Sequence, residues 1–287
     1  MHGFNSSYYR DSYVNRRIEI RMKKSARKTP CEYLNFLKDS REELQELVDC
    51  LGVNVTSFFR DKKPFDVMKK LVFPVIAEYA AKNGGNPVKI WSAACATGEE
   101  PYSIAISAVE SVGLEIKSGL KVQITATDID EKALLAAAKG EYTFKNMGGM
   151  DEKLIKRYFK HIGDKYVVNE KIKNMVAFSK LDIISGIQQD HFDLISCRNM
   201  LIYINMGLQK ELFEKFHSAL NPDGFLIIGK TEVLPFGMHR NFKTIDAGER
   251  IYQKIGQEVL WGGLIIKKSA YSWLTMTRGS EKCSARY

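Results

Sequence analysis

The spacing of hydrophobic positions divides the chain into a helical first part and a later part in which strand-like and helical patterns alternate. From Val14 to Met22 apolar residues recur every four positions, which predicts an amphipathic helix over 12–28. A Thr-Pro pair ends this helix, and the spacing of leucines and Tyr33 predicts further helix over 31–51. We therefore expect a small all-helical N-terminal domain over 1–72.

After the breaker AKNGGNP, short apolar β-rich runs alternate with helical stretches. This alternation is the signature of an α/β domain with a parallel sheet. The predicted strands are 88–93, 122–127, 176–181, 192–197, 225–229 and 250–254. The predicted helices are 98–112, 131–139, 150–159 and 207–220. An alternating piece at 165–168 predicts a small antiparallel β-subdomain near 162–175. We expect one Rossmann-like α/β domain over 73–255 and assign no role to a C-terminal tail, 256–287.

The composition, with 45% hydrophobic and 27% charged residues, is that of a soluble globular protein. The five cysteines form no CxxC pair and no metal-ligand spacing with the histidines, so we expect a reduced protein without a bound metal. No apolar run approaches the roughly 20 residues of a membrane span, and no hydrophobic signal core begins the sequence. We expect a cytoplasmic protein that does not insert into a membrane.

The net charge of +9 is concentrated at the two ends of the chain. Residues 1–30 carry a net +6 and residues 256–287 a net +3, whereas the region between them is balanced. A nucleic-acid cleft would load the main domain itself with basic residues, so we expect no nucleic-acid partner. The stripe of Arg17, Arg21 and Lys24 is either a solvated helix face or a docking surface for an acidic partner.

The first predicted strand runs into the turn Ala94-Cys95-Ala96-Thr97-Gly98, whose small residues allow a ligand to approach the backbone. Such a turn can also be mere tight packing. Asp128 ends the second strand, where an acid accepts the ribose hydroxyls of a nucleoside. Glu99 and Glu100 stabilise the start of the next helix but repel a phosphate from it. A ribose-containing cation without phosphate, S-adenosylmethionine, fits best.

Four separated motifs then resemble the chemotaxis receptor methyltransferase (CheR) family in order and spacing, over roughly residues 8–255. The motifs are Asn54-Val55-Thr56-Ser57-Phe58-Phe59-Arg60, residues 91–103 (WSAACATGEEPYS), Thr127-Asp128-Ile129-Asp130 and Cys197-Arg198-Asn199-Met200-Leu201-Ile202-Tyr203. The resemblance implies a methyltransferase-type Rossmann-like domain with a three-stranded antiparallel insert, preceded by the helical domain.

The resemblance also implies roles for particular residues. The implied cofactor contacts are Asn54, Thr56, Arg60, Glu99, Asp128, Asp182, Ile183, Arg198 and Asn199. Asp182 stands where the family pattern leads us to expect Asn. Arg60, Arg198 and Tyr203 are the implied catalytic residues, and the sequence leaves open which arginine holds the substrate carboxylate. The alternatives are a surface pair of Arg60 with Asp61, a turn cap by Asn199 and a core position for Tyr203.

The implied reaction is attack of a receptor glutamate on the methyl group of S-adenosylmethionine, which gives a γ-glutamyl methyl ester and S-adenosylhomocysteine. Glutamate is already ionised at neutral pH, so no general base is required. The implied partners are the cytoplasmic coiled-coil regions of methyl-accepting chemotaxis receptors, and we expect a monomer. The loop at 161–165 is short, which favours an enzyme that needs no receptor C-terminal peptide.

Two rival functions stay open from the sequence. A nucleic-acid methyltransferase on the same fold usually places [DN]PP[YF] after the fourth strand, where this chain reads Arg198-Asn199-Met200-Leu201, without proline. A non-catalytic regulator would bind the cofactor without turnover.

Overall fold

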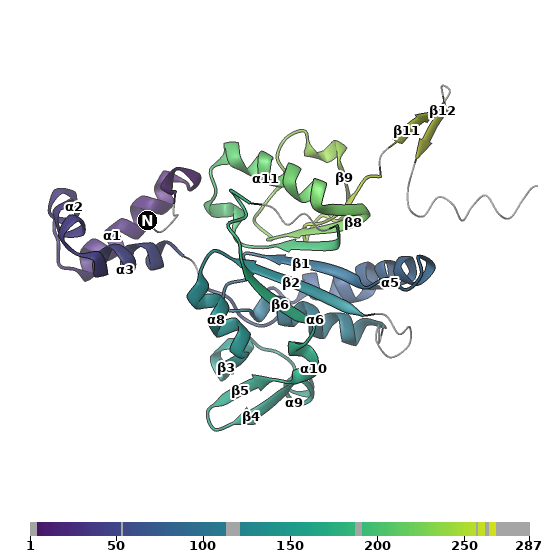
Figure 1. Ribbon diagram of the computed structural model, residues 1–287, viewed down its shortest axis with the longest axis horizontal. Helices are drawn as coiled ribbons and strands as arrows, with labels where there is room; N and C mark the ends of the chain where they lie inside the picture. The colour runs from purple at the N-terminus through teal and green to yellow at the C-terminus, as the bar shows by residue number, and fades with distance from the viewer. Residues whose placement is uncertain are drawn as a thin grey trace, which may run out of the picture.

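The computed structural model describes residues 5–52, 54–112, 121–186, 191–256, 258–261 and 264–267. A group of N-terminal helices stands beside a larger α/β body, and a small β-sheet projects from that body (Figure 1). The helices are η1 (Ser6–Tyr8), α1 (Asp11–Lys24), α2 (Pro30–Asp39), α3 (Arg41–Leu51), α4 (Lys63–Val67), η2 (Met68–Val72), α5 (Phe73–Lys82), α6 (Glu99–Val112), α8 (Glu131–Lys139), η3 (Phe144–Met147), α9 (Glu152–Tyr158), α10 (Glu170–Lys173), η4 (Leu201–Tyr203), α11 (Met206–Ala219) and η5 (Met238–Arg240). Within the described ranges, no helix has the length and apolar character needed to cross a membrane.

The strands form one large sheet and two small ones. They are β1 (Val88–Ala93), β2 (Val122–Asp128), β3 (Glu141–Thr143), β4 (Phe159–Ile162), β5 (Lys165–Val168), β6 (Val176–Lys180), β7 (Phe192–Cys197), β8 (Leu220–Ile228), β9 (Phe242–Asp246), β10 (Ile251–Lys254), β11 (Glu258–Trp261) and β12 (Leu264–Lys267). The large sheet has the order β6-β2-β1-β7-β8-β10-β9, in which β6 to β8 are parallel and β10 pairs antiparallel with both β8 and β9. The predicted Rossmann-like α/β fold is confirmed.

Alternating side chains of the central strands build a core on each face of this sheet. Ile90 and Leu194 face the layer that contains α5 and α6, whereas their neighbours Trp91 and Ile195 face α11. The period of two follows from the pleat of a strand that is covered on both sides. Figure 1 shows α11 and α6 on opposite sides of the sheet. The sheet is therefore held rigidly, and its carboxyl-terminal edge can position side chains accurately.

The N-terminal helices have their own small core. Tyr33, Leu47 and Leu51 are buried together, and the apolar face of α1 packs against them. The helical stretch predicted over 31–51 forms two helices, α2 and α3. Ser40 divides them: its extended backbone ends α2, and its hydroxyl accepts a hydrogen bond from the Glu43 amide, which caps α3.

Arg21 does not belong to an exposed basic stripe. Its guanidinium donates to both carboxylate oxygens of Glu43, at 3.0 and 2.8 Å, and pairs with Glu46 at 2.9 Å. The Tyr33 hydroxyl donates to the same Glu43 carboxylate. Periodicity alone placed Arg21 next to Arg17, but the interior of the three-helix group supplies a buried carboxylate that turns it inward. The residue fastens α1 to α2 and α3 instead of facing a partner.

Two boundaries differ from the sequence-based expectation. Phe58, Phe65 and Met68, which the expected division at residue 72 assigned to the helical domain, lie in the main core of the α/β body. The antiparallel subdomain has the order β3-β5-β4, so it begins at Glu141 and includes the predicted alternating piece as its central strand. Of the C-terminal tail, the structure describes Gly256 and the antiparallel pair β11 and β12; residues 257, 262–263 and 268–287 lie outside the described residues.

Candidate active site

A cavity of about 320 Å³ lies between the N-terminal helices and the carboxyl ends of the parallel strands. Neighbouring strands β1 and β7 connect onward in opposite directions, and such a switch point opens a crevice at this edge. The residues lining the cavity are Tyr9, Tyr13, Arg17, Leu51, Gly52, Asn54, Val55, Thr56, Arg60, Ala94, Cys95, Ala96, Glu100, Asp128, Ile129, Leu181, Asp182, Ile183, Arg198, Asn199, Met200 and Tyr203.

The turn after β1 forms part of the cavity wall through small residues in unusual backbone conformations. Ala94 and Ala96 have φ values of 56° and 48°, in the left-handed region. Gly98 has a φ of 92°, and a Cβ there would lie 2.7 Å from the Ala137 Cβ, so only glycine fits. The turn thus keeps its backbone close to the cavity and its helix close to α8, as the run of small residues indicated.

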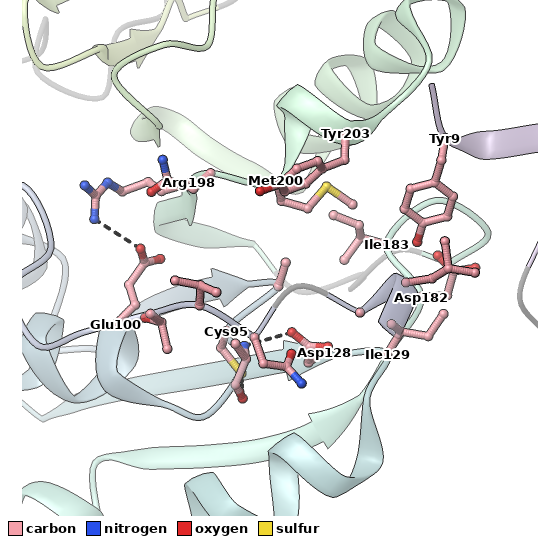
Figure 2. A pocket seen from close by; sticks show the side chains of 18 of the residues that line it. Tyr9, Cys95, Glu100, Asp128, Ile129, Asp182, Ile183, Arg198, Met200 and Tyr203 are labelled. Atoms are coloured by element: carbon pink, nitrogen blue, oxygen red, sulfur yellow. Dashed lines mark hydrogen bonds and ion pairs between the residues drawn. The ribbon is translucent and has the colours of Figure 1, made fainter. Parts of the chain in front are cut away.

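Asp128 is 8% exposed at the end of β2, and its carboxylate receives two backbone amides. The Ala96 amide donates to Oδ2 at 2.8 Å and the Asp130 amide to Oδ1 at 2.9 Å. Burial raises the pKa of this carboxyl, while the amide hydrogen bonds oppose the rise. The carboxylate is therefore fixed in direction and keeps lone pairs for a ligand in the cavity (Figure 2).

Glu99 and Glu100, at the start of α6, face different surroundings. Glu99 is fully buried and lies outside the cavity lining, with its carboxylate accepting from the Thr97 hydroxyl at 2.7 Å and the Asn146 amide at 2.8 Å. Glu100 lines the cavity instead. Successive helical positions point about 100° apart, so only one of two adjacent acids can face the crevice. The predicted cofactor contact of Glu99 does not fit this placement.

The two arginines also differ. The Arg198 side chain is 1% exposed and donates to Glu100 at 3.2 Å, to Asp61 at 3.3 Å and to the Arg60 carbonyl at 2.9 Å. Figure 2 shows it directed toward Glu100 at one end of the cavity. Arg60 is half-buried, and its guanidinium donates to the Val55 carbonyl at 2.8 Å. Among the described residues no carboxylate forms an ion pair with Arg60, and Asp61 pairs with Arg198 instead.

The remaining predicted site residues come from three segments. Asn54 and Thr56 line the cavity from the link between the two domains, and the Asn54 amide donates to Asp130 at 2.7 Å. Asp182 and Ile183 follow β6, and the Asp182 carboxylate accepts the Ile184 amide at 2.9 Å. The third segment, after β7, brings Asn199 and Tyr203. Of the predicted residues, all but Glu99 therefore meet at one cavity.

Several lining residues come from the N-terminal domain and were not predicted as site residues, and three of them lie in or before α1. Tyr9, Tyr13 and Arg17 close one side of the cavity. In Figure 2 the Tyr9 hydroxyl points toward Asp182, at the end opposite Arg198. Burial raises the pKa of the Tyr9 hydroxyl, and nearby Asp182 adds to the rise. The Tyr13 ring lies 4.6 Å from that of Tyr203. In the sequence Tyr13 and Arg17 look like ordinary residues of an amphipathic helix, and Tyr9 like a residue of the segment before it.

Backbone hydrogen bonds fasten the start of the chain over this cavity. Tyr9 forms an antiparallel bridge with Ile204, the Arg10 amide donates to the Tyr203 carbonyl at 2.9 Å, and the Asn205 amide donates to the Tyr8 carbonyl at 2.9 Å. Pairing between segments almost 200 residues apart has no local sequence signal. We name residues 5–10 the N-terminal strap.

The described part of the site contains no histidine, no metal-binding cluster and no reactive thiol. No described histidine lines the cavity. In the part of the chain that the structure describes, no cluster of three or more His, Cys, Asp or Glu residues could hold a metal ion. The Cys95 thiol lines the cavity but is buried, and burial raises its pKa well above its ordinary value. The thiol is therefore uncharged and contributes surface to the cavity rather than acting as a nucleophile.

Comparisons with known proteins agree with this geometry. The family description "CheR methyltransferase, SAM binding domain" matches residues 54–251, and "CheR methyltransferase, all-alpha domain" matches residues 2–51. The chain is similar to chemotaxis protein methyltransferase 1 of Pseudomonas aeruginosa, 36% identical over 239 residues, which are 81% of this chain and 84% of that protein. It is also similar to the chemotaxis protein methyltransferase of Borreliella burgdorferi, 34% identical over 237 residues, 81% of this chain and 83% of that protein.

Among solved structures, the plantazolicin methyltransferase BpumL in complex with SAH is a weaker likeness, with 16% identity, 59% of this chain and 49% of that chain covered, and a TM-score of 0.32. The two family descriptions divide the chain where the structure separates its helical group from its α/β body. The chain belongs to the CheR methyltransferase family, with S-adenosylmethionine as its cofactor.

Proposed function

We propose that this protein methylates glutamate side chains of chemotaxis receptors, forming γ-glutamyl methyl esters. The observation that carries the proposal is the composition of the cavity. It contains Asp128, a carboxylate placed to bind ribose hydroxyls, and Arg60, which forms no ion pair with a described carboxylate. The similarity to chemotaxis protein methyltransferases supports the choice of receptors as substrates. A cytoplasmic location, where the coiled-coil regions of receptors lie, is part of the proposal.

The residues present fit S-adenosylmethionine. Asp128 offers a fixed carboxylate for ribose hydroxyls, and Ile129 and Ile183 offer apolar surface for an adenine ring. Arg198 lines the cavity, and its Nε is buried without a hydrogen-bond partner among the described residues. A buried donor without an acceptor is energetically costly unless a ligand satisfies it. The carboxylate of the methionine part of S-adenosylmethionine is a suitable acceptor. Glu100 on the same wall disfavours a phosphate.

The reaction needs little proton chemistry from the chain. When bound, S-adenosylmethionine supplies an electrophilic methyl group on a positively charged sulfur. A receptor glutamate has an ordinary pKa of about 4.3 and is ionised at neutral pH, so it needs no base. The absence of a histidine from the described lining agrees with this. The contribution of the chain is to align the carboxylate and to exclude water from it.

We assign the substrate carboxylate to Arg60. The terminal nitrogens of Arg198 are already engaged by Glu100, Asp61 and the Arg60 carbonyl, so a second carboxylate would have to displace these partners. Arg60 is half-buried and bonds only a carbonyl in the described structure. In this assignment Arg198 stabilises the cavity wall through its bonds to Glu100 and Asp61. Tyr203 positions the reacting groups at the point of methyl transfer. Asn54, Thr56, Asp182 and Asn199 complete the proposed cofactor contacts.

The direct test is transfer of a radiolabelled methyl group to cytoplasmic fragments of the organism's own receptors. We expect base to release the label as methanol, because carboxyl methyl esters hydrolyse in base. Receptor fragments with the modified glutamates replaced by alanine should take no label. Labelling of RNA or DNA instead would establish the nucleic-acid rival, and cofactor binding without turnover on any receptor fragment would establish the regulator.

The Arg60→Ala variant tests the assignment of the carboxylate. We expect at least a tenfold loss of kcat, with a smaller change in the affinity for S-adenosylhomocysteine, because the guanidinium acts on the acceptor. If cofactor affinity instead falls in step with kcat, Arg60 serves mainly the cofactor and the acceptor contact must lie elsewhere.

A further inference from the structure

The segment after β7 supplies much of the cavity wall in few residues. Arg198, Asn199, Met200 and Tyr203 all line the cavity within a stretch of six positions (Figure 2). This stretch, which we name the catalytic turn (residues 198–203), meets the N-terminal strap at its end, where the Tyr203 carbonyl accepts the Arg10 amide at 2.9 Å, and no described strand pairs with residues 198–202. Asn199 has a φ of 61°, in the left-handed region. Something outside the turn must therefore hold it in place.

Glu232, from the loop that follows β8, meets the backbone of this turn. Its Oε2 accepts the Asn199 amide at 3.2 Å and the Gly229 amide at 2.5 Å, and its Oε1 accepts the Ile202 amide at 3.3 Å. The residue is 3% exposed. Within the described ranges no lysine or arginine forms an ion pair with Glu232. Peptide amides alone therefore balance its charge, and burial raises the pKa of its carboxyl.

The fit between this carboxylate and the turn is close. A Cβ built on Gly229 would lie 2.7 Å from the Glu232 Oε2 and 2.8 Å from the Asn199 amide nitrogen. Both distances are shorter than non-bonded atoms tolerate, so a glycine at the end of β8 is what lets the loop and the turn approach each other. The contact is specific to the backbone and does not depend on which side chains the turn carries.

Besides its bonds to the strap at Tyr203 and to the Gln209 side chain at Leu201, the catalytic turn is held from two sides. On one side Glu100 and Asp61 hold the Arg198 guanidinium, at 3.2 and 3.3 Å. On the other side Glu232 holds the main chain on either side of Met200. Fixing a side chain and a main chain independently leaves a short segment little freedom, and this is what a site requires when it works by alignment alone.

We propose that Glu232 is a positioning residue for methyl transfer, whose carboxylate gathers the amides of the catalytic turn and thereby sets the places of Asn199 and Tyr203 in the cavity wall. Glu232 does not line the cavity and acts only through the turn. The inference rests on the proposed function for its kinetic consequence, whereas its structural content, an anchored turn, is independent of the substrate.

The test is Glu232→Gln, which keeps the shape but replaces one acceptor oxygen by an NH₂ group that faces backbone amides. Asp193→Asn is the matched control. Asp193 is a half-buried carboxylate that also accepts a backbone amide, that of Lys89 at 2.9 Å, but it lies at the opposite end of β7. Burial raises its pKa as well. Both substitutions should lower stability, so stability alone cannot separate them.

Two readouts do separate them. We expect Glu232→Gln to lower kcat on receptor fragments at least tenfold, with a smaller loss of affinity for S-adenosylhomocysteine through the displaced Asn199. We also expect amide hydrogen exchange in the catalytic turn to speed up at least tenfold. Asp193→Asn should keep kcat within twofold and leave exchange in the turn unchanged. Unchanged exchange in the turn of Glu232→Gln, or an equal loss of kcat in both variants, would overturn the inference.

A second variant covers a failure of Glu232→Gln to fold. Gly229→Ala keeps the carboxylate and its charge but pushes it away from the turn, so the same loss of kcat and the same faster exchange are expected. A folded Gly229→Ala protein with wild-type exchange in the turn would contradict the proposal. If the wild-type protein does not methylate receptors at all, the proposed function fails, and the exchange comparison still decides whether Glu232 anchors the turn.

Discussion

At the scale of single residues, the site depends on buried charges that meet different kinds of partner. Asp128 and Glu232 are balanced by backbone amides, whereas Arg198 is balanced by two carboxylates. Amides are rigid parts of turns and strands, so they fix a carboxylate in direction without neutralising it. Such a carboxylate can still accept a ligand where it lines the cavity, as Asp128 does and Glu232 does not.

We predict that Asp128→Asn weakens binding of S-adenosylhomocysteine. The substitution keeps the volume and one amide contact but removes the charge that strengthens hydrogen bonds to ribose hydroxyls. Hydrogen bonds to charged groups contribute roughly 1.5–3 kcal/mol each, so we expect a loss of affinity of about tenfold or more. Isothermal titration calorimetry measures it. Wild-type affinity in a folded Asp128→Asn protein would remove Asp128 from the ribose site.

Site residues at the ends of strands could be predicted from the sequence, whereas site residues from segments distant in the sequence could not. Asp128 and Asn199 follow recognisable apolar strands, and parallel strands place their carboxyl ends at one edge. Tyr9 reaches the same cavity only through a bridge to Ile204, which no local pattern encodes. Which of Glu99 and Glu100 lines the cavity depends on the rotation of α6, which a motif does not specify to within one residue.

At the scale of elements, the N-terminal strap joins the helical domain to the segment that carries Tyr203. Its main-chain bonds to residues 203–205 hold the Tyr9 ring against the cavity. The strap therefore contributes Tyr9 to the wall at this end of the cavity. It leads directly into α1, which begins two residues after Tyr9.

We predict that Tyr9→Ala raises the Kd of S-adenosylhomocysteine about tenfold, because a buried aromatic contact contributes roughly 1 kcal/mol beyond its buried area. Tyr8→Ala is the control. Tyr8 does not line the cavity, and its strap contact is made by its main-chain carbonyl, which alanine keeps. Fluorescence or calorimetric titration gives both constants. Equal weakening by the two substitutions would mean that the strap, not the Tyr9 ring, is responsible.

Helix ends and edge strands limited the prediction of elements. Helix 131–139 was predicted with its observed bounds because Asp130 caps it and Gly140 ends it in the left-handed region. The division at Ser40 was missed because the apolar spacing continues across it. Strand β9 was missed as well: it is an edge strand in which only Phe242 is fully buried, so its hydrophobic pattern is weak.

The three N-terminal helices depend on the buried pair of Glu43 with Arg21. The guanidinium hydrogen bonds hold the pKa of Glu43 below its ordinary value of 4.5. A lowered folded-state pKa means that this stabilisation is fully present above about pH 4.5 and is lost as the pH falls through the lower folded value. Acid should therefore loosen the junction of α1, α2 and α3.

We predict that Glu43→Gln destabilises the protein by about 3 kcal/mol at pH 7, since removal of one partner leaves a buried charge unpaired. The difference from the wild type should shrink below pH 4.5, because the wild-type carboxyl then loses its charge as well. Denaturant unfolding at several pH values measures this. Glu42→Gln, at an exposed neighbour, should change little. A difference that is independent of pH would argue against the ion pair as its source.

At the scale of the whole molecule, the two domains were predictable and their contact was not. Periodicity separated a helical region from an α/β region, and the alternation of strands and helices indicated a parallel sheet. The position of one domain on the other depends on a few polar contacts between distant segments, such as Lys132 with Asp49 at 2.7 Å and Asn54 with Asp130. Residues of both domains line the cavity, so the site exists only in the assembled molecule.

The arrangement also revises which basic residues can face a receptor. Arg21 is buried in its ion pairs, and Arg17 lines the cavity with its guanidinium 5.2 Å from the Tyr13 ring. The exposed basic residues of α1 are Arg16, Lys23 and Lys24. Arg16 and Lys23 are seven positions apart and so share one face of the helix. This outer face, not the stripe through Arg21, is the proposed docking surface.

We predict that reversing Arg16, Lys23 and Lys24 to Glu lowers receptor methylation at least tenfold at low ionic strength, because acidic receptor helices are then repelled. The affinity for S-adenosylhomocysteine should not change, since none of the three residues lines the cavity. Exposed charges are screened over about 10 Å at 0.1 M salt, so the wild-type rate should fall with added salt while the variant depends on salt far less. Initial rates at several salt concentrations measure both effects.

The matched control reverses Lys70, Lys82 and Lys243, which are exposed on η2, α5 and β9, respectively. This variant changes the net charge by the same amount on elements that do not line the cavity. If only the net charge of the protein steers it to receptors, both variants should lose activity alike. If α1 is the docking surface, the control should keep its rate within about threefold and retain the salt dependence of the wild type, since steering acts through the charges nearest the contact.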